Sequence, residues 1–251
     1  MNLLLDFGNT RLKWAISSDS LSGGSRLAQK GAASYEEAPL STWAQTMRSM
    51  PINEIWFASV VGPDLETQVF TQISAVASVP KRFLVGAQAG ALQNCYATPQ
   101  TLGVDRWAAA IGAWGLLKQP CLVVCAGTAT TIDLIDAPQP DKANYRGGLI
   151  MPGLDLMLQS LHQRTARLPA AKGRYCAAPA VADNTDDAIT SGAIDATCGA
   201  IERMAQRLAD NAPWLITGGN AERLQAVLGT RAQVVEDLAL EGLAIHALNH
   251  H

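Results

Sequence analysis

A carboxylate, a tight turn, a hydroxyl and a cation follow one another near the start of the chain, at Asp6, Gly8, Asn9, Thr10 and Lys13. Because glycine lets backbone N–H groups come close to a ligand, such a turn can donate hydrogen bonds to phosphate oxygens. Asp6 is a candidate ligand for Mg²⁺, directly or through water, and Lys13 is a candidate partner for a terminal phosphate. An ordinary hairpin, in which Asp6 and Asn9 serve the turn, explains the stretch equally well.

Two further turns of small residues follow apolar segments. Residues 126–131 read Ala-Gly-Thr-Ala-Thr-Thr, and residues 217–220 read Thr-Gly-Gly-Asn before a predicted helix, whose N-terminus suits an anionic group. Two such turns facing each other across a cleft would hold a di- or triphosphate from both sides. The sequence has no Walker A pattern, no G-x-G-x-x-G motif and no protein-kinase signature. A nucleotide is therefore expected to bind as it does in the actin, hexokinase and Hsp70 superfold.

Asp105 and Arg106 stand where Gly103 leads into an apolar, helix-like segment. A carboxylate in the first turn of a helix is ordinarily stabilised by the macrodipole, and taken alone the pair favours that structural explanation. The functional explanation uses both side chains. Asp105 would accept the proton of a hydroxyl that attacks a γ-phosphate, and Arg106 would grip a carboxylate or a phosphate with two hydrogen bonds.

The elements that carry these motifs form a pattern that occurs twice. A buried strand, a glycine turn and a second strand are predicted at 2–17 and again at 121–135. The other predicted elements are strands at 55–60, 82–85 and 214–217 and helices at 104–117, 154–163, 185–208 and from about 236. No Pro- or Ser-rich linker divides the chain. The sequence therefore predicts an α/β protein of two similar lobes, at 1–115 and 116–251, with a ligand cleft between them.

Composition narrows the classes of protein. The 251 residues are 48% apolar and 16% charged, with a net charge of -3, which excludes a disordered chain and makes nucleic acid a poor partner. The longest uncharged apolar run, 107–117, falls short of the roughly 18 to 20 residues of a membrane span, and the N-terminus does not resemble a signal peptide. Five cysteines without a C-x-x-C pair indicate buried, reduced thiols and a cytoplasmic protein.

In order and spacing, the motifs resemble those of the type III pantothenate kinases along nearly the whole chain. The first phosphate motif of that family is matched at Asp6, Gly8, Asn9, Thr10 and Lys13. Its substrate motif is matched at Tyr96, Pro99, Gly103, Asp105 and Arg106, and its second phosphate motif at Gly127, Thr128, Ala129 and Thr131. A G-G-x-I-x-P-G stretch follows at 147–153. No single motif is specific, but the order of all of them is.

The resemblance implies two ribonuclease H-like lobes, with a nucleotide cleft between them, and the ATP- and Mg²⁺-dependent phosphorylation of pantothenate to 4′-phosphopantothenate, the first step of coenzyme A biosynthesis. By similarity Asp105 is the general base and Asp6 is the metal ligand. ATP would be held by Asp6, Gly8, Asn9, Thr10, Lys13 and Thr128. Pantothenate would be held by Tyr96, Gly103, Val104, Arg106 and Thr185. In the family the last contact comes from the partner subunit, so the resemblance implies a homodimer with its active site at or near the interface.

The chain departs from the family at Cys125, where an aspartate usually stands two residues before the glycine of the second phosphate motif. In the family that aspartate is associated with a monovalent cation such as K⁺ or NH₄⁺. A thiol is a poor ligand for a hard alkali cation, so we hypothesise that K⁺ binds weakly or not at all here, or that another group replaces the carboxylate.

Two alternative functions remain on the sequence alone. One is an accessory regulatory protein of the same fold without kinase activity, which the presence of both Asp6 and Asp105 disfavours. The other is an exopolyphosphatase-like hydrolase or a different sugar or acyl kinase, which Tyr96 and the Gly-Val-Asp-Arg stretch at 103–106 disfavour. Trp107 and Trp114, seven residues apart on one predicted helix, indicate a core or a dimer contact.

Overall fold

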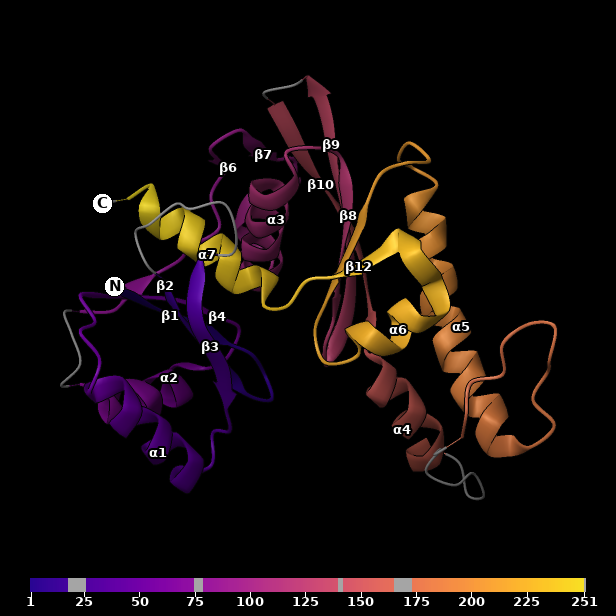
Figure 1. The fold of residues 1–251 in the computed structure, drawn as a ribbon, viewed down its shortest axis with the longest axis horizontal. Helices are drawn as coiled ribbons and strands as arrows, with labels where there is room; N and C mark the ends of the chain where they lie inside the picture. The colour runs from indigo at the N-terminus through magenta and orange to yellow at the C-terminus, as the bar shows by residue number, and fades with distance from the viewer. Residues whose placement is uncertain (18–25, 75–78, 140–141, 165–172, 251) are drawn as a thin grey trace. The chain divides into compact units, whose positions relative to one another are not determined.

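The chain folds into two compact units, one formed by Met1–Lys118 with Asp237–His251 and the other by Gln119–Glu236 (Figure 1). The computed structural model describes residues 1–17, 26–74, 79–139, 142–164 and 173–250. The chain passes from the first unit to the second after Lys118, near the expected boundary between residues 115 and 116. The end of the chain differs from the expectation, because residues 237–251 return to the first unit instead of staying in the second.

Glycines explain why the last helix returns. Helix α7 (Leu238–Leu248) packs on α3 (Val104–Leu117), which lies at the predicted position. A Cβ atom on Gly242 would lie 1.8 Å from the carbonyl oxygen of Ala108, and one on Gly112 would lie 2.3 Å from that of Leu238. The two helix backbones therefore approach each other more closely than any larger residue allows.

A mixed five-stranded sheet forms the centre of the first unit, in the order β3-β2-β1-β4-β5. Strand β1 runs antiparallel to β2 and parallel to β4, and its register places Asp6 opposite Lys13. The strands are β1 (Asn2–Phe7), β2 (Leu12–Ser17), β3 (Leu27–Ala33), β4 (Glu54–Ser59) and β5 (Lys81–Arg82). Three of these confirm predicted strands; β5 covers only the start of the predicted 82–85, and β3 was not anticipated.

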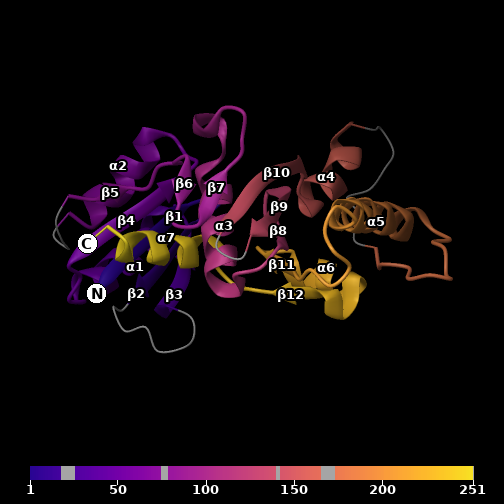
Figure 2. The ribbon, with the colours of Figure 1, turned by 90° about the horizontal axis from the view of Figure 1, so that it is seen from above.

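Helices cover both faces of this sheet. Helices α1 (Glu37–Arg48) and α2 (Pro63–Gln72) lie on one face, and α7 crosses the other (Figures 1 and 2). Alternate β1 residues Leu3, Leu5 and Phe7 join the core on the α1 side, as the two-residue period of a strand requires. A short hairpin, β6 (Gln88–Ala89) and β7 (Leu92–Asn94), and the 3₁₀ turn Pro99–Thr101 lead into α3.

The second unit repeats the plan of the first. Its strands have the order β12-β11-β8-β9-β10, and β8 runs antiparallel to β9 and parallel to β11, as β1 does to β2 and β4. They are β8 (Cys121–Ala126), β9 (Ala129–Gln139), β10 (Lys142–Pro152), β11 (Trp214–Thr217) and β12 (Ala232–Val234). The helices are α4 (Leu154–Arg164), α5 (Thr185–Ala205) and α6 (Ala221–Leu228), followed by the 3₁₀ turn Gly229–Arg231. The predicted pair of similar α/β lobes is confirmed.

Two expectations from composition can be compared with this structure. Within the described ranges, none of the helices combines the length and the apolar character needed to cross a bilayer. The cysteines form no disulfide in the described part of the chain; Cys121 and Cys198 are buried, whereas Cys95 is exposed. The expectation of buried thiols therefore holds for only some of them.

Candidate active site

The turn after β1 is held by hydrogen bonds on both sides of Gly8. The N–H of Gly8 donates to the carbonyl of Asp6 at 3.1 Å, and the hydroxyl of Tyr35 donates to the carbonyl of Gly8 at 2.8 Å. Asn9 and Thr10 are exposed. The turn therefore presents these two side chains to solvent on a fixed backbone, as a phosphate-binding turn requires.

Asp6 lies in a cluster of carboxylates drawn from three elements. Burial raises its pKa to about 6; Lys13 opposes the shift, and the charges of Asp105 and Asp237 add to it. The charge of the predicted base therefore acts on the predicted metal ligand. Because burial disfavours the charged form of Asp6, a bound cation that neutralises the carboxylate would stabilise that form.

Oxygen donors of this kind suit Mg²⁺. In the described part of the chain, no group of three or more His, Cys, Asp or Glu side chains is arranged to hold a metal ion by itself. Mg²⁺ usually keeps several water molecules and takes one or two carboxylates together with substrate phosphates. Asp6 fits a site of that type, in which a nucleotide supplies the remaining oxygens.

Asp237 is a site residue that the sequence analysis missed. Its carboxylate lies 3.5 Å from the ammonium group of Lys13 and 3.6 Å from that of Lys30. It precedes α7 in the left-handed region, at φ 54°, and its side chain makes no capping hydrogen bond. An aspartate just before an apolar helix usually caps that helix. The sequence pattern at Asp237 therefore favours a capping role, whereas the structure gives it ion pairs with two lysines.

The substrate motif forms a second group of contacts in the first unit. Arg106 is 4% exposed, and its guanidinium donates to the hydroxyl of Tyr96 at 3.2 Å. The carboxylate of Asp105 accepts from the N–H of Arg106 at 2.9 Å and remains partly exposed. A Cβ on Gly103 would lie 2.7 Å from that carboxylate, so a larger residue would push the side chain of Asp105 aside. The helix start thus buries the cation and keeps the acid accessible.

Three chain segments meet at the phosphate turn of the second unit. The N–H of Gly127 donates to the carbonyl of Ala129 at 3.1 Å. The N–H of Gly153 donates to the carbonyl of Thr128 at 2.9 Å. The N–H of Asn220 donates to the carbonyl of Ala126 at 3.1 Å. Thr128 is exposed on this fixed turn. The second and third glycine turns of the sequence analysis, at 126–131 and 217–220, therefore lie together within one unit.

Cys125 lies in the middle of a row of three neighbouring strands. Its register partners are Thr131 on β9 and Thr217 on β11, and paired residues share one face of a sheet. Thr131 is 7% and Thr217 6% exposed, and neither hydroxyl has a partner among the described residues. The row offers a thiol and two hydroxyl oxygens but no carboxylate, and the thiol at its centre is a poor ligand for a hard alkali cation.

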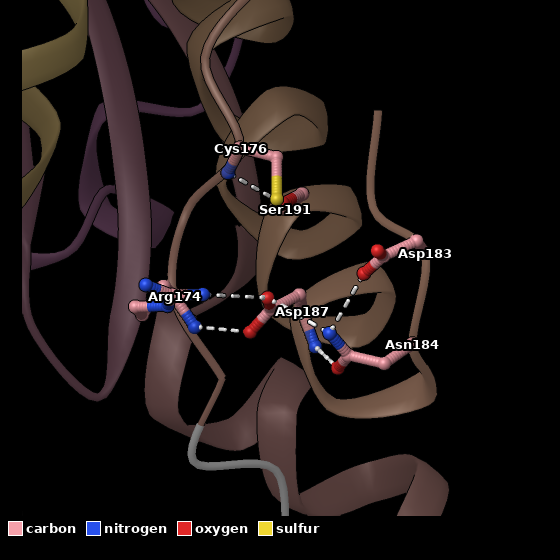
Figure 3. A network of polar contacts seen from close by, with 6 residues as sticks. All are labelled: Arg174, Cys176, Asp183, Asn184, Asp187 and Ser191. Atoms are coloured by element: carbon pink, nitrogen blue, oxygen red, sulfur yellow. Dashed lines mark hydrogen bonds and ion pairs between the residues drawn. The ribbon is translucent and has the colours of Figure 1, made fainter. Parts of the chain in front are cut away.

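Thr185 is the first residue of α5, next to a network of polar contacts (Figure 3). Asn184 caps the helix by accepting from the N–H of Asp187 at 2.9 Å, and its amide donates to the carboxylate of Asp187 at 3.0 Å. The N–H of Arg174 donates to the same carboxylate at 2.7 Å. These hydrogen bonds, the one from Asn184 first, lower the pKa of Asp187. Thr185 itself is exposed at a firmly capped helix start.

The predicted site residues thus form two groups. The first unit brings together Asp6, Lys13 and Asp105 through their charges, and Tyr96 and Arg106 through contact. Gly8, Asn9 and Thr10 form the turn beside Asp6, and Gly103 and Val104 begin α3. Thr128 and Thr185 belong to the second unit.

Comparison with known proteins assigns this chain to a family. Residues 2–207 match the family model described as type III pantothenate kinase. A type III pantothenate kinase of Dechloromonas aromatica is 41% identical over 250 residues, covering 99% of each chain. One from Aromatoleum aromaticum is 39% identical over 250 residues, covering 98% of each.

Solved structures show the same fold at low sequence identity. A Campylobacter jejuni protein described as a Baf family transcriptional activator gives a TM-score of 0.61 at 19% identity, covering 99% of this chain and all of that one. The ADPNP-bound activator of the 2-hydroxyisocaproyl-CoA dehydratase from Clostridium difficile gives 0.55 at 10%, covering 99% and 94%. The expected actin/hexokinase/Hsp70-like architecture is confirmed, and by its sequence the chain belongs to the type III pantothenate kinase family.

Proposed function

We propose that Asp105 is the general base in the phosphorylation of pantothenate, the reaction that membership of this family assigns to the chain. The observation that carries the proposal is the partly exposed carboxylate of Asp105, at the start of α3, within electrostatic reach of Asp6. Asp105 would take the proton of the primary hydroxyl as its oxygen bonds to the γ-phosphorus of ATP. The bond from that phosphorus to the β,γ-bridging oxygen breaks, and ADP leaves.

The buried Arg106 is the proposed anchor for pantothenate. Its guanidinium donates to the hydroxyl of Tyr96, and the planar fork of a guanidinium matches the two oxygens of a carboxylate such as that of the substrate. Gly103 and Val104 would line the same region, since they begin the helix that carries both charged residues. Because Arg106 would hold the carboxylate end of pantothenate, the hydroxyl at its other end would be positioned next to Asp105.

On the nucleotide side, Asp6 would hold Mg²⁺, and Lys13 would contact a terminal phosphate. Gly8, Asn9 and Thr10 would supply backbone and side-chain donors, and Thr128 would do so from the second unit. Mg²⁺ when bound neutralises charge on the phosphates; the chain's part is to hold the ion and to align the phosphoryl group.

A homodimer in the cytoplasm is the proposed state of the protein. The exposed Thr185 would reach the pantothenate bound by the partner subunit, and the Asn184–Asp187 cap would keep it in place. The row around Cys125 supports the further proposal that K⁺ or NH₄⁺ is not required, because a thiol and two hydroxyls replace the expected carboxylate.

The test is the transfer of labelled phosphate from ATP to pantothenate by the purified protein with Mg²⁺. Asp105→Asn is expected to lower the rate by on the order of a hundredfold or more. Asp64→Asn is the matched control and should leave the rate unchanged, because Asp64 is an exposed carboxylate at the second position of α2, and Asp105 stands at the second position of α3. Absence of transfer would favour the accessory regulatory function, and equal rates for Asp105→Asn and the unmodified protein would remove Asp105 from the mechanism.

A further inference from the structure

A pocket lies in the first unit, at the part of α3 that follows the proposed catalytic residues. It has a volume of about 400 Å³, within the roughly 300 to 1,000 Å³ of small-molecule sites. Its walls come from α3, α7, the segment after β5 and the β6–β7 turn. Trp107, Ile111 and Trp114 line it from α3, and Phe83 lines it from the segment after β5. These four apolar side chains are almost completely buried and are therefore fixed by packing, and the lining also includes the polar side chains of Gln88, Lys118 and Asn249.

One polar group in this wall lacks a hydrogen-bond partner among the residues that the structure describes. Trp114 is 4% exposed, and its indole Nε1 makes no hydrogen bond to any described residue. A buried donor left without an acceptor costs free energy that a ligand acceptor would recover. The sequence analysis expected Trp107 and Trp114 to be core or dimer contacts; both are buried, and both also line this pocket.

The charge of the lining is one-sided. Lys118, the residue that ends α3, lines the pocket with its ammonium group 5.8 Å from the centre of the Trp114 ring. Its backbone is left-handed, with φ 51°. The described residues that line the pocket include no carboxylate. A cation beside an unpaired N–H donor favours an anionic group, since each would contribute one charge-assisted or neutral hydrogen bond.

The pocket is also lined by His246, which adds no charge to it near pH 7. His246 stacks edge-on against Phe83 and Trp56, with ring centres 4.7 Å and 5.2 Å away, and burial lowers its pKa to about 4. It is therefore neutral near pH 7 and behaves as an aromatic wall. His250 packs against it, with ring centres 4.0 Å apart.

We propose that this pocket binds a small organic anion with an aromatic or branched apolar body. The body would lie between Trp107, Ile111 and Phe83, and the anionic group would accept from the Nε1 of Trp114 and pair with Lys118. The site is separate from the proposed kinase chemistry, and it does not depend on it.

The test uses 8-anilinonaphthalene-1-sulfonate, an aromatic anion whose fluorescence rises on binding, titrated into the full chain. One probe per chain and quenching of tryptophan fluorescence are expected. Trp114→Phe and Lys118→Gln should each raise the dissociation constant about three- to tenfold, the net value of one typical hydrogen bond. Trp43→Phe is a matched control, because Trp43 is also buried with an unpartnered Nε1 but does not line the pocket. Lys142→Gln is the control for the charge, because Lys142 is an exposed lysine of the second unit.

Three results would overturn the proposal. Equal affinity for N-phenyl-1-naphthylamine, which lacks the sulfonate, would show that no anion site exists. Displacement of the probe by ATP with pantothenate would place it in the kinase site. Unchanged affinity in both pocket variants, with their folding confirmed by circular dichroism, would place the probe elsewhere on the molecule.

Discussion

The two units share a strand plan but differ in the chemistry at one equivalent position. Asp6 is the fifth residue of β1, and Cys125 is the fifth residue of β8; a glycine follows two residues after each. The row through Asp6 pairs it with Lys13 and Ala58, whereas the row through Cys125 pairs it with Thr131 and Thr217. One row is charged and the other is neutral. The comparison teaches that a repeated backbone can carry a carboxylate paired with a cation in one copy and neutral side chains at the equivalent position in the other.

Each row lowers the stability of the folded protein, but for a different physical reason. The charged row holds a carboxylate whose pKa is raised to about 6, mainly by burial. The neutral row leaves two buried hydroxyls without partners among the described residues. Each cost is expected at a site shaped by function more than by stability. Three substitutions, measured in four experiments, test whether this division is real.

Removing the charge at Asp6 is expected to have the largest effect. Asp6→Asn keeps the shape of the side chain but removes the proposed ligand of Mg²⁺. We expect phosphate transfer to fall by on the order of a hundredfold or more, as when a preorganised electrostatic group is lost. Steady-state rates over a range of Mg²⁺ concentrations measure this. If Cys125→Ser, the isosteric control in the other row, lost as much, the two rows would not differ in function.

The same variant is expected to gain stability. The folded-state pKa of Asp6, about 6, lies above the usual 3.8, so ionisation destabilises the folded protein. The stability that Asp6 contributes is present below about pH 4, falls as the pH rises to 6, and is absent above it. At pH 7 without Mg²⁺, Asp6→Asn should raise the free energy of unfolding by about 1 to 3 kcal/mol, with no gain at pH 4. Urea unfolding at both values measures this, and an equal gain at both would contradict the assigned cause.

Restoring the charge in the neutral row tests the role of Cys125. Cys125→Asp supplies the carboxylate that the family usually has at this position. We expect K⁺ to raise the rate of the variant severalfold while leaving the unmodified protein unaffected. The measurement is the rate with KCl against tetramethylammonium chloride at equal ionic strength. Strong K⁺ activation of the unmodified protein would mean that the Cys125 row, or another group, binds the cation without a carboxylate.

The smallest effect is expected from an unpartnered hydroxyl. Thr217→Val keeps the shape of the buried side chain and removes a group without a partner. The free energy of unfolding should stay the same or rise by up to about 1 kcal/mol. Thr197→Val is the matched control, because the hydroxyl of Thr197 donates to the carbonyl of Ala193 at 2.9 Å and its loss should destabilise. A destabilised Thr217→Val would show that the hydroxyl has a partner, such as water.

Much of the fold followed from local patterns. Helix α3 and strand β11 begin and end where the sequence predicted, because an apolar run between a glycine and a proline, or before a glycine pair, fixes both ends. The duplicated strand–turn–strand pattern indicated the two units. Strand β3, with several exposed residues and little apolar alternation, gave no such signal.

The parts of the site that depend on distant contacts could not be predicted in this way. Asp237 meets Lys13 only because α7 returns to the first unit, and that return depends on the close contact of Gly112 with Gly242. Tyr35 supports Gly8 across 27 residues of sequence. Neither relation leaves a periodic or motif-like trace. The motifs indicated which residues are chemical, and tertiary packing determined which of them support each other.

The return of α7 also has a consequence for the order in which the protein is made. The second unit is inserted between residues 118 and 237 of the first, so a ribosome finishes it while the first unit still lacks its last helix. Domains generally fold as units during synthesis. The second unit can therefore assemble early, whereas the first waits for the final residues, with Gly112 and Trp114 of α3 uncovered until then. A nascent chain stalled before residue 237 would have neither Asp237 nor the α7 wall of the pocket, so both appear only when translation ends.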